Sequence, residues 1–146
     1  KPALQVATVQ VNTQQDAKEV TWLAPARVFA RNPSKNNLAA MATARGVVQF
    51  DVIVKQAPTK QVQFTVGCGA SCGASLDLSA TFSGDAVGRK QTVKIPLACF
   101  GKLGADLAGV DTPFSITADA PFAAAFTDIQ VVAGAGDADD VVKCAQ

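Results

Sequence analysis

The sequence predicts a single all-β domain, an antiparallel β-sandwich or jelly roll. Short runs with apolar residues at every second position recur along the chain, a period that is typical of strands with one buried face. Turn-forming residues separate these runs, and no stretch keeps a helical period over a long distance. The length of 146 residues suits one domain with its own core and is too short for two.

The predicted strands, in chain order, are 4–11, 20–22, 26–29, 48–54, 62–68, 76–78, 93–97, 114–116 and 125–131. Pro58 lies in the connection between two of them, so we expect residues 48–68 to form a β-hairpin. Residues 12–16 are polar and predict a turn, and residues 31–37 predict the clearest long loop. Pro96 indicates a strand end or a sheet edge. Phe100, Leu103 and Leu107 have helix-like spacing interrupted by glycines, which predicts a turn or a short helical piece.

The four cysteines indicate disulfides and an oxidising compartment. Cys68 and Cys72 lie at a strand end, where three nearby glycines allow a turn tight enough for the two sulfurs to meet. We favour disulfides over a zinc site because a structural zinc site usually has two short Cys pairs. Of the three pairings, we expect Cys68–Cys72 with Cys99–Cys144, since proximity favours the first and leaves the second.

Composition argues against several classes of protein. The net charge is +1 and no basic stripe is visible, so nucleic acid is not an expected partner. The apolar stretches are far shorter than the roughly 20 residues of a membrane helix, so no membrane is expected either. His is absent, which removes Ser-His-Asp and Cys-His catalysis and the usual metal ligand.

The start of the sequence suggests a piece of a longer protein. The sequence opens at Lys1-Pro2, without an initiator Met or a signal peptide. We interpret residues 1–146 as one accessory domain, with residues 1–3 as the remnant of a linker and residues 134–146 as a C-terminal tail.

Several segments together resemble one family. In chain order they are Gln15–Trp22, Val48–Val52, Cys68–Cys72, Ile95–Phe100, Gly104–Leu107, Thr112–Phe114 and Asp128–Ile129. This ordered set is similar to the C-terminal galactose-binding-like domain of bacterial exo-acting β-glucosidases and glucan glucohydrolases of glycoside hydrolase family 3. The match runs over nearly the whole chain. It departs from the family pattern at Gln91, about where a Trp often stands, and this weakens any inference about a shared ligand surface there.

The resemblance implies a domain that follows two catalytic domains in a secreted or periplasmic bacterial enzyme. The nucleophile Asp and the acid/base Glu of that family belong to the catalytic domains, so no catalytic residue is carried over to this chain. The leading expectation is a mainly structural accessory domain that packs on those catalytic domains. The alternative is a carbohydrate-binding module that holds β-glucan, and a third is a free-standing extracellular adhesion domain. The absence of Tyr and the single Trp favour the structural role.

Each candidate site residue has both a functional and a purely structural interpretation. Trp22 is a candidate platform for stacking a sugar, but a core position beside Val20 is favoured. The carboxylate pairs Asp106/Asp111 and Asp77/Asp85 would suit glycosidase chemistry, but solvated loop carboxylates are far commoner. The donors of the loop 31–37 would suit sugar hydroxyls, although long polar loops rarely bind.

The acidic tail is the remaining candidate for an ion site. Asp137, Asp139 and Asp140 would suit calcium, which galactose-binding-like domains often bind. Their spacing is not that of an EF-hand, so a solvated tail is favoured. We therefore predict no metal site and no cofactor.

Overall fold

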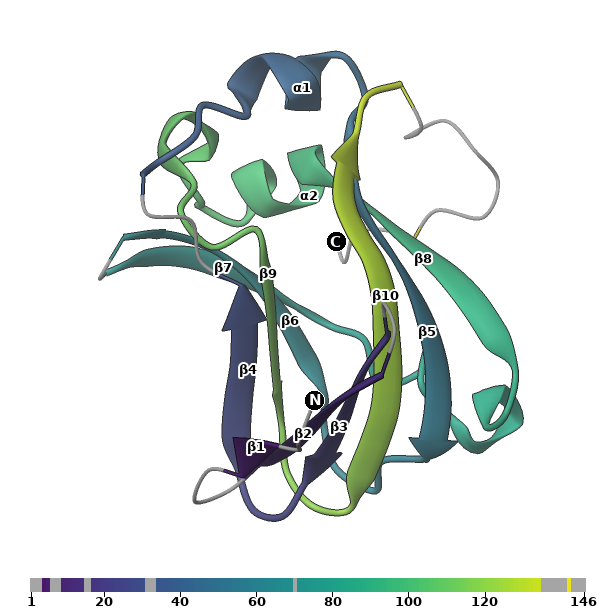
Figure 1. Cartoon of the computed structure of the whole chain (residues 1–146). Helices are drawn as coiled ribbons and strands as arrows, with labels where there is room; N and C mark the ends of the chain where they lie inside the picture. The colour runs from purple at the N-terminus through teal and green to yellow at the C-terminus, as the bar shows by residue number, and fades with distance from the viewer. Residues whose placement is uncertain are drawn as a thin grey trace.

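The computed structural model describes residues 4–5, 9–14, 17–30, 34–69, 71–134 and 142. Within them, two antiparallel sheets pack face to face (Figure 1), which confirms the predicted β-sandwich. The strands are β1 Leu4–Gln5, β2 Val9–Gln14, β3 Ala17–Trp22, β4 Ala26–Ala30, β5 Val47–Gln56, β6 Gln63–Gly69, β7 Cys72–Asp77, β8 Lys90–Pro96, β9 Phe114–Ala118 and β10 Phe122–Val132. One sheet has the order β1-β2-β3-β10-β5-β8 and the other has the order β4-β9-β6-β7.

The core lies between the sheets and is centred on four phenylalanine rings. Phe50 and Phe126 come from the six-stranded sheet, and Phe64 and Phe114 come from the four-stranded sheet. The ring centroids of Phe50 and Phe114 are 5.3 Å apart, and those of Phe64 and Phe114 are 5.5 Å apart. These are favourable distances for edge-to-face contacts. The apolar residues at every second position of the predicted strands are thus the side chains that pack between the two sheets.

The predicted hairpin over residues 48–68 is wrong. β5 lies in the six-stranded sheet and β6 in the four-stranded sheet, so the connection around Pro58 crosses from one layer to the other. Their apolar faces meet across the core, where Phe50 and Phe64 are stacked at 5.8 Å. Each strand has one apolar face, and alternation alone does not tell a neighbour in the same sheet from a partner in the facing sheet.

The N-terminal strand prediction also needs correction. The predicted strand 4–11 is two short strands that fold back on each other, since Leu4 of β1 pairs with Val11 of β2. β2 continues to Gln14, so the polar run from Asn12 begins as strand rather than as turn. Residues 6–8, 15 and 16, which complete these two predictions, lie outside the described residues. Polar residues are tolerated here because β2 pairs with β3 away from the centre of the sheet.

The last strand begins earlier than predicted and contains a bulge. β10 starts at Phe122, and Phe122, Ala124 and Phe126 are buried. Its register with β5 shifts between Thr127 and Gln130, where Asp128 has a φ of 53°. An extra residue of this kind resets the alternation of a strand. The predicted strand over residues 125–131 is therefore present, but the alternation of its inward and outward side chains changes at the bulge.

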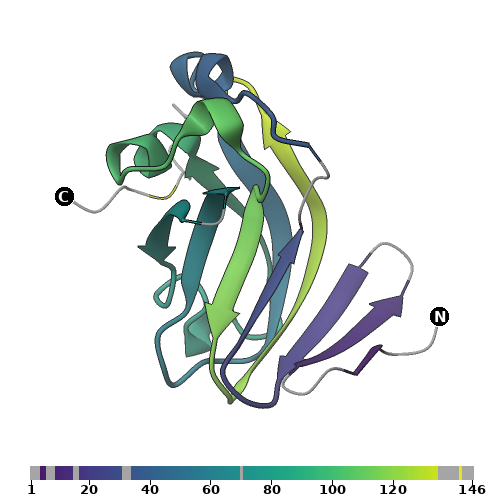
Figure 2. The ribbon, with the colours of Figure 1, turned by 90° about the vertical axis from the view of Figure 1, so that its left-hand side faces the viewer.

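Short helices close one end of the sandwich (Figures 1 and 2). The helical spacing around Phe100 forms α2, Leu97–Lys102, and the 3-10 turn η2, Leu107–Gly109, as predicted. α1, Ala39–Thr43, was not predicted, because five residues are too few to show a helical period. A further 3-10 turn, η1, spans Gly84–Ala86. None of the helices in the described ranges is long and apolar enough to cross a membrane.

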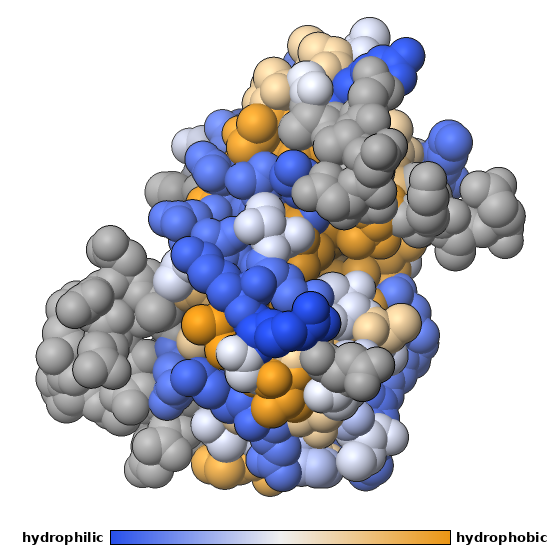
Figure 3. Space-filling view, turned by 90° about the vertical axis from the view of Figure 1, so that its right-hand side faces the viewer, coloured by the Kyte–Doolittle hydropathy of each residue, from blue (hydrophilic) through white to orange (hydrophobic). Residues whose placement is uncertain are grey.

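The outer face of the six-stranded sheet is largely polar (Figure 3). Asp51 of β5 accepts a hydrogen bond from Thr92 at 2.6 Å and pairs with Lys90 of β8 at 3.6 Å. Lys55 and Glu19 approach to 4.0 Å across β10. β8 is the edge of this sheet and ends at Pro96, which confirms the interpretation of that proline.

Removing one phenylalanine ring from the central cluster should strongly destabilise the domain. Phe50→Ala should lower the free energy of unfolding by about 3–5 kcal/mol, because the mutation removes buried apolar surface and leaves a cavity between the sheets. Urea denaturation followed by Trp22 fluorescence would measure the loss. Gln49→Ala, on the neighbouring half-buried position, is the control and should change stability by less than about 1 kcal/mol. Equal losses for the two variants would contradict the central role of the ring.

Candidate binding groove

A groove of about 310 Å³ lies on the outer face of the four-stranded sheet. Phe64, Val66 and Cys68 of β6 are buried toward the core, so Thr65 and Gly67 between them face outward. The lining residues come from three strands and the loop before β9: Arg27, Thr65, Gly67, Gly69, Cys72, Asp111 and Thr112. The sheet thus offers a hollow of polar side chains and bare backbone.

Glycines on β6 and β7 bring the loop before β9 to the edge of the groove. Gly67 pairs with Gly73, so neither strand has a side chain at this level. The N–H of Gly67 donates to the carbonyl of Thr112 at 2.9 Å, and the N–H of Asp111 donates to the carbonyl of Gly67 at 3.1 Å. A Cβ atom on Gly67 would lie only 3.1 Å from the Cβ of Thr112. Glycine is therefore needed for this close approach, which places the Asp111 carboxylate at the groove.

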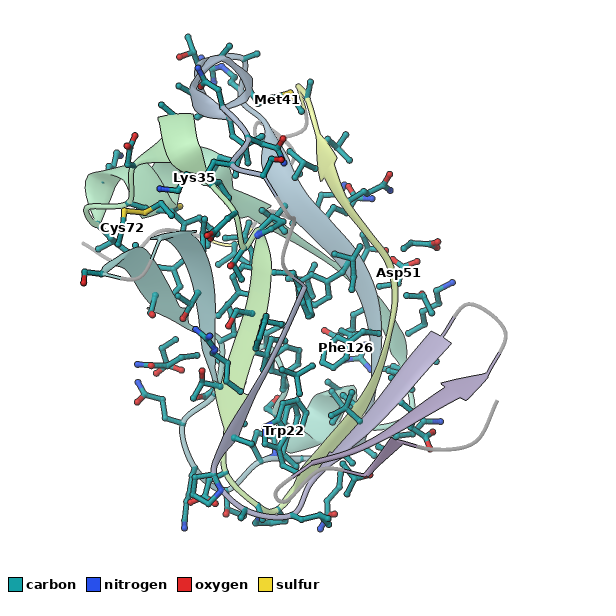
Figure 4. The ribbon with its side chains drawn as sticks, turned by 60° about the vertical axis from the view of Figure 1, so that its left-hand side comes forward. Trp22, Lys35, Met41, Asp51, Cys72 and Phe126 are labelled. Atoms are coloured by element: carbon teal, nitrogen blue, oxygen red, sulfur yellow. A yellow bond between two sulfur atoms is a disulfide. The ribbon has the colours of Figure 1, made fainter. Side chains whose placement is uncertain are left out.

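The predicted disulfide between Cys68 and Cys72 is present and forms one end of the groove. It joins the end of strand β6 to the start of strand β7, with the two Cα atoms 4.9 Å apart. Gly69 between them has a φ of 128°, a conformation that favours glycine. The bonded Cys72 lies toward the same end of the molecule as Lys35 (Figure 4). A Cβ on Gly69 would lie 3.2 Å from the amino group of Lys35, so this cation stands beside the groove.

Arg27 stacks on an exposed aromatic ring at the opposite side of the groove. The guanidinium carbon of Arg27 lies 4.7 Å from the centroid of Phe29, and the Phe29 side chain is 44% exposed. The other seven Phe are all buried. Phe29 is thus the exposed aromatic residue in the part of the chain that the structure describes.

Ser115 has a buried hydroxyl on the same face of the sheet. It pairs with Phe29 across β4 and β9, and such partners share a face. On its other side, the register that pairs Ile116 with Phe64 brings Thr65 next to Ser115. Ser115 is 0% exposed, and its Oγ has no hydrogen-bond partner among the described residues. Leaving such a group unsatisfied costs about 1–3 kcal/mol, so it marks a place that a water or a ligand would complete.

Trp22, the candidate for sugar stacking, lies in the core. Its side chain is 2% exposed, its ring packs on Phe122 at 4.9 Å, and its indole N–H donates to the carbonyl of Ala26 at 3.0 Å. Figure 4 shows Trp22 between the two sheets. The favoured core interpretation is therefore correct, and no face of this ring is open to a sugar.

The carboxylates considered for catalysis serve local backbone structure. Asp106 accepts from the N–H of Ala108 at the start of η2 at 3.0 Å, and Asp111 accepts from the hydroxyl of Thr112 at 2.9 Å. Hydrogen bonds from the side chain and then the backbone of Ser79 hold the pKa of Asp77 below its ordinary value of 3.8. A lowered pKa keeps this carboxyl ionised, which is the reverse of what a general acid needs. The side chain of Asp85 is not described.

Other predicted site residues fall in different places. Cys99 is buried in α2, but its predicted partner Cys144 lies outside the described residues, as do Asp137, Asp139 and Asp140. Among the described residues there is no cluster of three metal-ligating side chains. Gln91 lies half-buried on β8, and its side-chain amide donates to the carbonyl of Thr81 at 3.2 Å. β8 belongs to the six-stranded sheet, whereas the groove lies on the four-stranded sheet.

Sequence reasoning missed the groove itself. Arg27 and Phe29 were predicted only as parts of a strand, and Asp111 was weighed with Asp106 as a catalytic pair. The loop 31–37, considered for its donors, came nearer, since its Lys35 stands beside the groove. A further usable signal was the pair of glycines, Gly67 and Gly73, placed symmetrically about the cysteines. Two facing glycines indicate a shallow place in a sheet, although the loop that borders it is not evident from their spacing.

The chain belongs to the Exop_C family, described as galactose-binding domain-like, whose pattern matches residues 1–131. No curated protein matches the sequence. The fold and the family together confirm the predicted galactose-binding-like sandwich and the resemblance from which it was inferred.

Solved structures share this fold at low sequence identity. The extra C-terminal domain of the exo-1,3/1,4-beta-glucanase ExoP from a Pseudoalteromonas species has a TM-score of 0.74 and 18% identity, covering 100% of this chain and 84% of that chain. The whole ExoP glucanase matches with a TM-score of 0.74 and 17% identity, covering 99% of this chain but only 18% of the glucanase. The family 30 carbohydrate-binding module of the Clostridium thermocellum cellulosomal cellulase Cel9D-Cel44B has a TM-score of 0.65 and 14% identity, covering 90% and 86% of the two chains.

The Ser79 hydrogen bonds to Asp77 should make part of the stability depend on pH. Because the folded state lowers this pKa, the contribution is present above 3.8 and is lost as the pH falls through the lowered value. The carboxyl is exposed, so the effect should be at most about 1 kcal/mol. Asp77→Ala should therefore lose stability against the parent near neutral pH, and the difference should shrink in acid. Urea denaturation at several pH values would test this, and a difference that persists unchanged in acid would contradict it.

We expect Cys99 and Cys144 to form the second disulfide. Closing a loop of several tens of residues would stabilise the domain by about 4 kcal/mol in the chain-entropy account. Peptide mapping without reductant should recover a Cys99–Cys144 link beside Cys68–Cys72. A Cys68–Cys99 link or four free thiols in natively prepared protein would contradict this pairing.

Proposed function

We propose that the chain is a non-catalytic accessory domain of a bacterial β-glucan-degrading β-glucosidase of glycoside hydrolase family 3. The observation that carries this proposal is the match of the entire chain to the extra C-terminal domain of a glucanase. That domain is one part of a much longer chain, so the corresponding partner of this domain would be a set of catalytic domains. The disulfide supports a secreted or periplasmic location.

Its main role is to pack on those catalytic domains. Surfaces that grip polysaccharide usually combine stacking aromatics with converging polar groups. Here Trp22 and seven of the eight Phe are buried, so little aromatic surface is available for that purpose. Packing within one chain needs only a modest apolar patch with a polar rim. Among the described residues, exposed apolar side chains at separate places on the surface could each contribute to such a contact: Leu23, Val87, Leu103 and Ile129.

Glycan binding is the second candidate role. The groove beside Arg27 and Asp111 favours it, and so does the fold shared with a family 30 carbohydrate-binding module. The two roles are compatible, because the exposed apolar residues named for packing do not line the groove. We do not propose a free-standing adhesion domain, because the glucanase neighbour carries the corresponding domain inside a much longer chain.

Deleting the domain from the glycosidase that carries it should reduce that enzyme's thermal stability or change its activity on small soluble glucosides. A structural contact acts on the enzyme whatever the size of the substrate, whereas loss of a polysaccharide anchor would affect only insoluble glucan. Differential scanning calorimetry and aryl-glucoside hydrolysis would measure the two effects. The purified chain alone should release no glucose and should show little retention on insoluble β-glucan.

Two results would count against the packing role. One is a deletion that changes neither the melting temperature nor activity on soluble substrates. The other is binding of the purified chain to glucan at micromolar affinity. Thr117→Ala in the intact enzyme is the matched control, because it shortens one exposed side chain without removing the domain.

A further inference from the structure

We infer that the groove on the four-stranded sheet is a subsite for one neutral pyranose unit of a glycan. The inference deepens the second candidate role, glycan binding, and rests on it, and it depends only on the described face of β4, β9, β6 and β7. It is tested on the chain by itself, so its failure would leave the packing proposal untouched.

The polar groups of the groove match the chemistry of sugar hydroxyls. Each hydroxyl of a pyranose both donates and accepts hydrogen bonds. Arg27 supplies fixed donors and Asp111 supplies acceptors, and both line the same hollow with the hydroxyls of Thr65 and Thr112. The hydrogen bond from Thr112 holds the Asp111 carboxylate at the groove and leaves its second oxygen to accept from a ligand.

The floor of the groove allows close approach of a ring. Gly67 and Gly69 both line it, and Gly67 faces Gly73 across the strands, so backbone rather than side chains forms the bottom. The strand ends are fixed by the disulfide and by the hydrogen bonds between Gly67 and the loop before β9. A site held in this way is formed before the ligand arrives.

Ser115 is an independent observation that points to a ligand. Its hydroxyl is fully buried, has no partner among the described residues, and lies on the groove face between Phe29 and Thr65. Arg27, whose guanidinium stacks on Phe29, is exposed on the same face of the sheet. A sugar hydroxyl that reached Ser115 from this face would supply its missing hydrogen bond.

Size and charge favour a single neutral unit. A volume of about 310 Å³ lies at the small end of ligand pockets. The residues that line the hollow include one cation, Arg27, and one anion, Asp111, so the lining carries no net charge and suits an uncharged sugar, with Lys35 standing beside it. With one aromatic ring and a few hydrogen bonds, we expect a dissociation constant of about 1–10 mM. Such a contact would position a glycan end rather than anchor a polymer.

Amide chemical shifts of the isotope-labelled chain would test the site during titration with β-1,3- and β-1,4-linked gluco-oligosaccharides. The expected result is a fast-exchange shift confined to amides around Thr65, Gly67, Gly69 and Thr112. Absence of shifts at millimolar concentrations would overturn the inference. Shifts centred on another face, or shifts produced only by an oligogalacturonide used as the anionic probe, would overturn it as well.

Three variants separate the subsite from a general effect on folding. Asp111→Asn keeps the acceptor for Thr112 but removes the charge, and it should weaken binding by about tenfold. Ser115→Ala should weaken binding severalfold while leaving the melting temperature unchanged or higher, because it removes a buried unsatisfied hydroxyl. Thr117→Ala is the matched control on the same strand and face, outside the groove lining, and should bind as the parent does. Unchanged affinity in both Asp111→Asn and Ser115→Ala would overturn the inference.

Discussion

The contact of four phenylalanine rings between the two sheets is the constraint on which the rest of the structure depends. Phe50 and Phe126 face Phe64 and Phe114, and the rings meet edge-to-face or stacked at 5.3–5.8 Å. Once these rings are buried, the alternation of each strand fixes which of its residues face outward. The phase of Phe64 therefore turns Thr65 toward the groove, and the phase of Phe114 turns Ser115 toward the same face.

Burial of aromatic rings in the core also limits which side chains are left for the outer surface. Burial of Trp22 and nearly all Phe in the core leaves Phe29 as the aromatic ring that the outer face offers among the described residues. The groove is thus built from small and polar components: glycine backbone, hydroxyls, one carboxylate and one guanidinium. Its shape is set by a disulfide and by a loop pinned to Gly67, both of which hold backbone rather than side chains.

Similarity of fold limits what can be carried over from other proteins. The three solved structures compared above are 14–18% identical to this chain, and at that level they establish the sandwich but not its site. A role for the groove consequently depends on Arg27, Asp111 and Ser115 themselves. The accessory role is proposed instead from how the matched domain lies within a longer glucanase.

The sequence by itself determined the fold class, nearly every strand, the Cys68–Cys72 disulfide and the core position favoured for Trp22, because these depend on local alternation, local turns and composition. It did not determine that β5 and β6 belong to different sheets, that the first strand folds back, or that β10 contains a bulge. Those features follow from pairing between segments far apart in the chain, for which a period of two carries no information. The groove was decided in the same way: Arg27, Gly67 and Asp111 come from three separated segments that the pairing of β4, β9 and β6 brings together in one sheet.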